Sequence, residues 1–252
     1  MSATKTATRP PDDSCVVVTA GQAVGGQLCE GLRSRGCRVV WLYDASGAVD
    51  TAAAQTARAV SLRAKADLLA ELEQAAGGAG LPKLVVLSVV PTALQTCVDT
   101  DTISEEQWRE GVDSTARAFR YALQGAHALL SKSGGGTIVC LGPAFGLVGA
   151  ARLLGLSTLL EAQRALVKSA ARQWGSKGIR VHWISLGEAG NFALLERAPL
   201  PRTPELGPPP PALGSVPAAR ELAGLIHWLA SDDAKVLTGA TMVADGGEWM
   251  VP

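Results

Sequence analysis

Three glycines and two titratable side chains are the residues of this sequence whose type and placement could support chemistry. Gly21, Gly25 and Gly26 follow an apolar run and open a helical pattern, where backbone N–H groups can bind a phosphate or another anion. His182 and Glu188 lie in and just after a later apolar run, and could exchange protons in a non-redox reaction. The simpler interpretations are a tight strand-to-helix turn for the glycines, a hydrogen-bonded strand histidine for His182 and an exposed loop glutamate for Glu188.

The composition argues against several other kinds of site. Lysine plus arginine and aspartate plus glutamate number 23 each, so no net field attracts nucleic acid or an anionic membrane. The five cysteines are scattered and the three histidines do not complete a ligand set. We therefore expect no metal site, and free buried thiols in a reducing compartment. Residues 1–14 are polar, and no run of 18 apolar residues occurs, which predicts a flexible N-terminal segment and a cytoplasmic protein.

Short apolar runs alternate with helical patterns through residues 15–252. Several runs are continuous stretches such as Val16-Val17-Val18, typical of strands buried on both faces of a parallel sheet. The expected strands are Cys15–Ala20, Cys37–Tyr43, Arg58–Leu62, Lys83–Val90, Gly136–Gly142, Ile179–Ser185 and Ala240–Asp245. The expected helices are Val24–Arg35, Lys65–Ala76, Ser104–Lys132, Gly155–Lys177 and Val216–Ser231. This order predicts a single α/β domain with a doubly wound, seven-stranded parallel sheet flanked by helices.

Two local patterns refine this outline. Ser104 is followed three residues later by Gln107, which fits a capping box at the start of a helix. Residues 191–215 carry seven prolines, and too little chain follows them to build another domain. We therefore expect a stiff proline-rich loop within the one domain.

Four segments of the last third carry a family resemblance. They are Gly178–His182, the helical stretch Ala218–Asp232, Leu237-Thr238-Gly239 and Val243-Ala244-Asp245-Gly246-Gly247. Together they closely resemble short-chain dehydrogenases/reductases, and the match extends over residues 15–247. The resemblance implies a Rossmann-type fold with strand order 3-2-1-4-5-6-7.

The family's nucleotide-binding residues are altered at several positions. Its motif T-G-x-x-x-G-x-G, aligned on the threonine of the first strand, has Ala20 and Val24 in place of the first two glycines and keeps only Gly26. Val24 is expected to put a β-branched side chain where backbone meets the pyrophosphate. Tyr43 stands where an acidic residue holds the ribose, and residues 88–91 replace Asn-Asn-Ala-Gly. We therefore expect no cofactor, with the remnant glycines at 21, 25 and 26 as the open alternative.

The four positions that carry the family's chemistry are also replaced. By the resemblance, Pro143 stands for the serine, Leu156 for the tyrosine, Leu160 for the lysine and Thr115 for the asparagine. Leucine cannot exchange a proton, and proline has neither a hydroxyl nor a backbone N–H. The leucines at 153–160 are expected to pack as core, with an apolar ligand pocket as the alternative.

These replacements lead to a functional hypothesis. The chain is expected to be a catalytically inactive subunit of a mixed oligomer with an active sister dehydrogenase, assembled through the helices at 104–132 and 155–177. The small residues of the first helix favour close helix packing. The alternatives are a non-redox enzyme (a dehydratase, cyclase or isomerase) on an apolar substrate, an active reductase with rearranged residues, and a small-molecule sensor.

Overall fold

A seven-stranded parallel sheet forms the centre of the protein. The computed structural model describes residues 14–20, 22–44, 57–91, 94, 98–187 and 210–250. The strands are β1 (Ser14–Thr19), β2 (Arg38–Asp44), β3 (Ala57–Val60), β4 (Leu84–Ser88), β5 (Gly136–Pro143), β6 (Ile179–Leu186) and β7 (Thr241–Ala244). Their order is β3-β2-β1-β4-β5-β6-β7, and all neighbouring strands are parallel. The seven predicted strands and the predicted strand order are confirmed.

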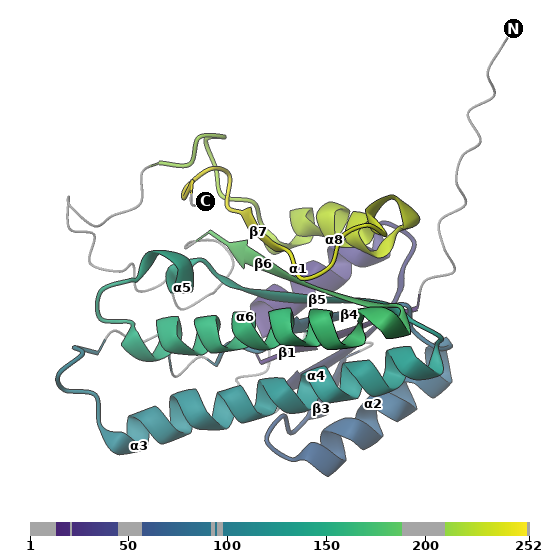
Figure 1. Ribbon diagram of the computed structural model, residues 1–252, viewed down its shortest axis with the longest axis horizontal. Coiled ribbons are helices and arrows are strands. Elements are labelled where there is room, and N and C mark those ends of the chain that lie inside the picture. Colours follow the sequence, from purple (N-terminus) through teal and green to yellow (C-terminus); the bar gives the residue numbers. More distant parts are fainter. Residues whose placement is uncertain are drawn as a thin grey trace, which may run out of the picture.

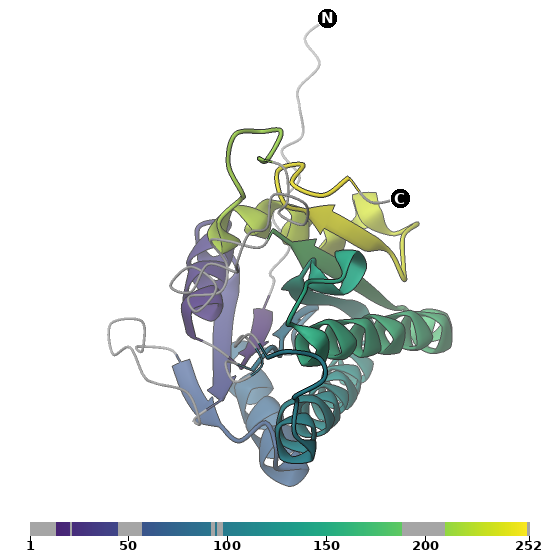
Figure 2. The ribbon, with the colours of Figure 1, turned by 90° about the vertical axis from the view of Figure 1, so that its left-hand side faces the viewer.

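Helices cover both faces of this sheet. On one face, α2 (Lys65–Ala79), α4 (Ser114–Lys132) and α6 (Leu154–Trp174) lie side by side, and α1 (Gln22–Arg33) and α8 (Ala223–Ala230) lie on the other (Figures 1 and 2). Every residue of β1 and β4 is buried as a result. This two-sided burial explains why these strands read as continuous apolar runs.

The long helix predicted at residues 104–132 is a chain of three helical segments. Helix α3 (Glu105–Trp108) begins with the predicted capping box, in which Ser104 Oγ accepts from Gln107 N at 3.1 Å and Gln107 Oε1 accepts from Ser104 N at 2.8 Å. A π-helical turn, η3 (Arg109–Asp113), then leads into α4. The expected periodicity of 3.6 residues gave no sign of this widened turn.

The remaining helical predictions differ mainly at their ends. Helix α6 is followed by the 3₁₀ turn η4 (Gly175–Lys177), and α8 is preceded by the 3₁₀ turn η5 (Ala219–Leu222). The short helix α5 (Phe145–Val148) and the 3₁₀ turn η6 (Asp232–Ala234) were not predicted. Of the proline-rich segment 191–215, residues 191–209 lie outside the described residues, as do residues 1–13.

The small residues of α4 pack within the chain. Ala122 is fully buried, and a Cβ added at Gly125 would collide with Leu72 and press on Leu69, both on α2. Close packing of α4 on α2 therefore accounts for the small residues from which subunit association was inferred. No helix within the described residues is long and apolar enough to cross a bilayer.

Helix α1 approaches the sheet closely at Gly25. A Cβ at this position would lie 2.6 Å from the ring of Trp41 on β2. The ring is held in place because its Nε1 donates to Thr19 Oγ1 on β1 at 3.0 Å, in a buried hydrogen bond. Gly25 is thus required by the packing of α1 against β1 and β2.

This contact predicts opposite effects for two glycine substitutions. Gly25→Ala should lower the free energy of unfolding by about 1–3 kcal/mol, because the added methyl group overpacks the helix against Trp41. Gly77→Ala is the control in α2, where nothing lies within 4 Å of the added Cβ. It should raise the free energy of unfolding by up to about 1 kcal/mol through helix propensity. Urea unfolding of both variants measures the two changes, and equal effects would contradict the packing argument.

Candidate functional site

The carboxyl ends of β1 and β4 and the start of α1 form the edge where the family resemblance places a nucleotide. Strand β1 ends at Thr19, and the N–H of Ala20 donates to the carbonyl of Ser88, which ties the turn to β4 at 2.9 Å. Helix α1 begins at Gln22, and its first N–H groups have no acceptor within the helix.

Val24 does not obstruct this edge as its sequence position suggested. It lies inside α1, its side chain is 6% exposed, and it belongs to the apolar core. Because residue 24 already lies within the helix, the valine side chain packs in the core. Of the remnant glycines, Gly25 packs on Trp41, Gly26 is half-buried, and Gly21 lies outside the described residues.

The end of β2 supplies the residues nearest to an adenosine position. Tyr43 is half-buried, and its ring lies 5.7 Å from that of Trp41 at a tilt of 50°. Asp44 is the last residue of the strand. An aromatic ring followed by a carboxylate replaces the family's single acidic residue here.

The four family catalytic positions are occupied by buried side chains. Pro143 is the last residue of β5 and pairs with Leu186 of β6. Leu156 and Leu160 are buried on α6, and Thr115 is buried in the first turn of α4. The two tyrosines of the chain lie on other elements: Tyr43 on β2, and Tyr121 on α4, where Lys65 and Arg120 approach its ring.

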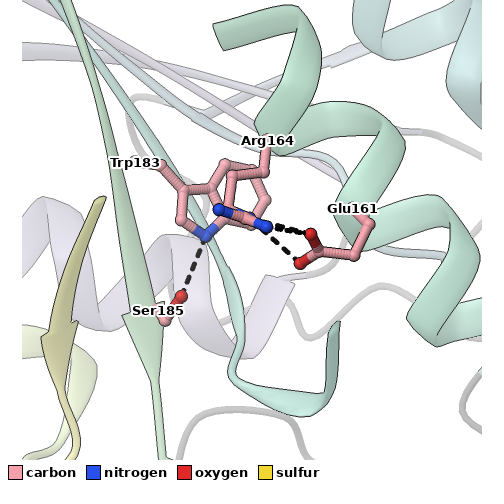
Figure 3. A network of polar contacts seen from close by, with 4 residues as sticks. All are labelled: Glu161, Arg164, Trp183 and Ser185. Carbon is pink, nitrogen blue, oxygen red and sulfur yellow. Dashed lines mark hydrogen bonds and ion pairs between the residues drawn. The ribbon is translucent and has the colours of Figure 1, made fainter. Parts of the chain in front are cut away.

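A tryptophan fills the space beside the lysine position. Trp183 of β6 is buried, and a Cβ at Gly142 would lie 2.6 Å from its ring and 2.7 Å from Leu160 Cδ2. The ring donates from Nε1 to Ser185 Oγ at 3.0 Å, and on α6 Glu161 pairs with Arg164 (Figure 3). Leu160 therefore packs in apolar surroundings that a lysine side chain would have to leave or disturb.

The leucines at 153–160 are divided between the core and the wall of a cavity. Leu156, Leu159 and Leu160 are fully buried in the core. Leu153 and Leu154, together with Leu156, also line a cavity of about 370 Å³ beside the start of α6.

Gln163 is a buried polar residue that the sequence analysis missed. It lies three residues after Leu160 on α6, and its Nε2 donates to the carbonyl of Val89, directly after β4, at 2.7 Å. Its Oε1 has no hydrogen-bond partner among the described residues. A lone glutamine on an otherwise apolar helix face was the signal in the sequence.

His182 is not the hydrogen-bonded strand histidine that was expected. It is fully buried, and neither ring nitrogen has a hydrogen-bond partner within the described part of the chain. Burial, with a smaller contribution from the charge of Arg180, lowers its pKa to about 4. Arg180 lies two residues earlier on the same face of β6 and donates to the carbonyls of Ala230 and Ser231.

This placement separates His182 from α6. Trp183, which contacts the α6 side, points to the opposite face of the strand. The imidazole therefore lies on the other side of the sheet from α6, where the resemblance places the family's catalytic positions. It is neutral at physiological pH. Glu188, the other proposed acid/base, lies outside the described residues.

Cys15, Cys29, Cys37 and Cys140 are buried and form no disulfide bonds, as predicted. Burial raises the pKa of Cys29 to about 12 and that of Cys140 further, so these thiols stay protonated and unreactive. Within the described ranges, no three His, Cys, Asp or Glu residues gather in a way that could hold a metal ion.

The fold and this edge define a Rossmann-type dehydrogenase domain, and comparisons with known proteins agree. A sequence profile described as enoyl-(acyl carrier protein) reductase matches residues 19–248. The chain belongs to this family of short-chain dehydrogenases/reductases.

Named relatives match along nearly the whole chain. Galactitol 2-dehydrogenase (L-tagatose-forming) of Cereibacter sphaeroides is 25% identical over 244 residues, which is 94% of this chain and 95% of the relative. Cis-4-hydroxycyclohexanecarboxylate dehydrogenase of Sinomonas cyclohexanicum is 29% identical over 239 residues, covering 92% and 94%. The structure of NAD⁺-bound xylitol dehydrogenase shares the fold, with a TM-score of 0.79 at 16% identity over 95% of this chain and all of that one.

These relatives overturn the hypothesis of an inactive subunit. Chains that match this one from end to end are named as dehydrogenases, which points to an oxidoreductase. The non-redox alternative is superseded for the same reason.

The buried imidazole predicts a specific acid sensitivity. Because the folded-state pKa of His182 is lowered from 6.5 to about 4, only the unfolded chain binds a proton between these values. The neutral state of His182 contributes fully to the free energy of unfolding above pH 6.5. As the pH falls to about 4, this contribution is lost and the free energy of unfolding decreases by up to about 3 kcal/mol. Urea unfolding between these pH values measures the loss.

A substitution isolates this residue from the other titrating groups. His182→Leu should flatten the decline of stability between pH 6.5 and 4, since no proton can then be taken up at this position. His227→Leu, at a half-buried position on α8, should leave the decline unchanged. A His182→Leu variant as acid-sensitive as the parent would show that another group is responsible.

Proposed function

We propose that the protein is an oxidoreductase that interconverts a small secondary alcohol and the corresponding ketone with a nicotinamide dinucleotide. The main support is the match to two dehydrogenases, which in each case covers more than nine-tenths of this chain and of the relative. Both relatives are named for hydroxylated substrates, one a sugar alcohol and the other a hydroxylated cyclohexane ring. A small hydroxylated compound is therefore the substrate class to test.

The nucleotide edge fits the adenosine and phosphate part of such a cofactor. The twelve-residue helix α1 begins at Gln22, shortly after β1 ends at Thr19, and Val24 is buried in the core. The N–H groups at this helix start would hold the pyrophosphate, and Tyr43 and Asp44 would lie toward the ribose. When bound, the nicotinamide ring would supply or accept the hydride.

The proposal includes the absence of the family's serine, tyrosine and lysine. Pro143, Leu156 and Leu160 at those positions cannot exchange a proton or bind a ribose hydroxyl. The proton of the alcohol must then pass to water or to another side chain, of which Glu188 is the candidate that the sequence offers. General acid–base catalysis contributes about 10²–10⁴-fold, so turnover should be slower by about this factor than with a phenol in place.

Cofactor binding and turnover test this function together. We expect titration calorimetry to give a dissociation constant between about 1 μM and 1 mM for NADH or NADPH. We expect slow, substrate-dependent oxidation of the same cofactor with cyclohexanone or tagatose. Ala20→Asp should weaken cofactor binding at least about tenfold, because a carboxylate beside the α1 N-terminus repels phosphate at a cost above 1.4 kcal/mol. Ala70→Asp, at an exposed position on α2, is the matched control.

Two outcomes would refute the proposal. One is the failure of both dinucleotides to bind at concentrations up to about 1 mM. The other is equal binding by the parent and the Ala20→Asp variant, which would place the cofactor elsewhere.

We further propose that the chain assembles through the outward faces of α4 and α6, with a second copy or with a sister dehydrogenase. The buried small residues of α4 do not support this, since Gly125 packs on α2 and Ala122 is buried within the subunit. The support is the partly exposed apolar residue Leu166 on α6 together with exposed Ala128 on α4.

We also propose that the protein is located in the cytoplasm.

Multi-angle light scattering of the intact chain tests this assembly. We expect a dimer or a larger oligomer, and Ala128→Glu should shift it toward monomer, because the charge would be buried in the interface. Ala122 is unsuitable for this test, because it is buried within the subunit and a charge there would unfold the chain. A monomeric parent protein would contradict the assembly.

A further inference from the structure

A cavity of about 370 Å³ lies between the start of α3 and the start of α6. This volume is within the range of about 300–1,000 Å³ that small-molecule sites occupy. Its apolar lining comes from the loop after β4 and from the segment that leads into α6. The apolar lining residues are Leu94, Val98, Ile103, Leu153, Leu154 and Leu156.

An unusual backbone arrangement holds one side of this cavity in place. Val98 and Leu153 form an isolated parallel bridge, and the N–H of Val98 donates to the carbonyl of Arg152 at 2.8 Å. Arg152 has φ +64°, and it alone among the described non-glycine residues has a positive φ. A left-handed conformation is unfavourable for arginine, and such residues cluster at ligand sites.

The opposite side is built by the π-helical turn η3. Gly111 of this turn and Gly155 of α6 both face Leu94, and a Cβ on either glycine would press on the leucine side chain. Leu94 therefore enters between the two helices, which brings the loop after β4 against them. Single π-helical turns within α-helices are frequent at functional sites.

The charges around the opening indicate what kind of molecule fits. Arg152 Nε pairs with Asp99 Oδ1 at 2.7 Å, and Arg63 Nη1 pairs with Glu110 Oε2 at 2.8 Å. Glu106 is the further charged lining residue, and no cation pairs with it among the described residues. This carboxylate would repel an anionic ligand, whereas it would not repel an uncharged molecule.

The polar groups beside the apolar wall are few. Ser104 Oγ and Gln107 Oε1 already accept hydrogen bonds in the capping box. The amide Nε2 of Gln107 and the hydroxyl hydrogen of Ser104 take no part in these two bonds and remain available as donors, and both residues line the cavity. These donors suit a single oxygen acceptor on an otherwise apolar molecule.

We propose that this cavity is a binding site for a small, uncharged, apolar compound that carries one hydroxyl or carbonyl oxygen. Leu156 lines the cavity, whereas Pro143 and Leu160 do not. The site therefore lies beside the family's catalytic positions and is separate from the nucleotide edge. It does not rest on the oxidoreductase function and can be tested without turnover.

Binding of the neutral fluorescent naphthalene ketone Prodan to the intact chain tests the site. We expect its emission to shift to the blue on binding, and cyclohexanol to displace it. Leu154→Trp and Ile103→Trp should each weaken binding at least about tenfold, because the indole ring occupies the cavity. Leu166→Trp is the matched control, at a half-buried leucine on the same helix that does not line the cavity.

Several outcomes would overturn the proposal. Prodan could fail to bind, or it could bind the parent and both cavity variants equally. A loss of binding in Leu166→Trp equal to that in Leu154→Trp would show that the probe reports general loosening of the fold. Displacement of Prodan by NADH would place the probe in the nucleotide edge instead. Retention of Prodan with NADH present, and its loss in the two cavity variants alone, supports the site.

Discussion

Burial of the central sheet on both faces is the constraint on which the rest of this structure depends. The side chains of β1 and β4 are enclosed by helices on either side, so these strands cannot carry exposed polar groups along their length. Polar chemistry is confined to the strand ends and to the loops beyond them. The helices must also approach closely, and glycines at positions such as Gly25 allow them to do so.

The same packing determines how the carboxyl edge is filled. Trp183 occupies the volume between Gly142 and Leu160, and its indole N–H is satisfied by Ser185. A lysine at position 160 would have to displace this ring or lose its charge, since a buried unpaired ammonium group is strongly disfavoured. The apolar filling and the loss of the proton-transferring residues therefore belong to one rearrangement, which extends from α6 across two strands.

Gln163 and His182 are two of the buried polar side chains in this core. Gln163 connects α6 to the end of β4 through the carbonyl of Val89, and its Oε1 has no hydrogen-bond partner among the described residues. His182 has neither nitrogen satisfied and stays neutral because burial opposes its charge. Unsatisfied buried groups cost about 1–3 kcal/mol each. Gln163 offsets part of this cost by one hydrogen bond, whereas His182 shows no such compensation.

The relation between the glycine motif and function shows how an alignment can mislead. Aligned by position, Val24 replaces a glycine and is expected to block a phosphate. In the fold it is the third residue of α1 and packs into the core, so its place in the core accounts for the side chain. Relatives that match more than nine-tenths of the chain are named as dehydrogenases.

The sequence by itself determined the seven strands, their order by family resemblance and the capping box at Ser104. These features depend on residue type and on spacing along the chain, and both can be read locally. Tertiary structure decided the burial of Val24, the packing of Gly125 on α2, the position of Trp183 and Leu160 beside Gly142 and the cavity bounded by the Val98–Leu153 bridge. Each of these depends on segments that are distant in sequence and meet only when the sheet and its helices assemble, so no local pattern encodes them.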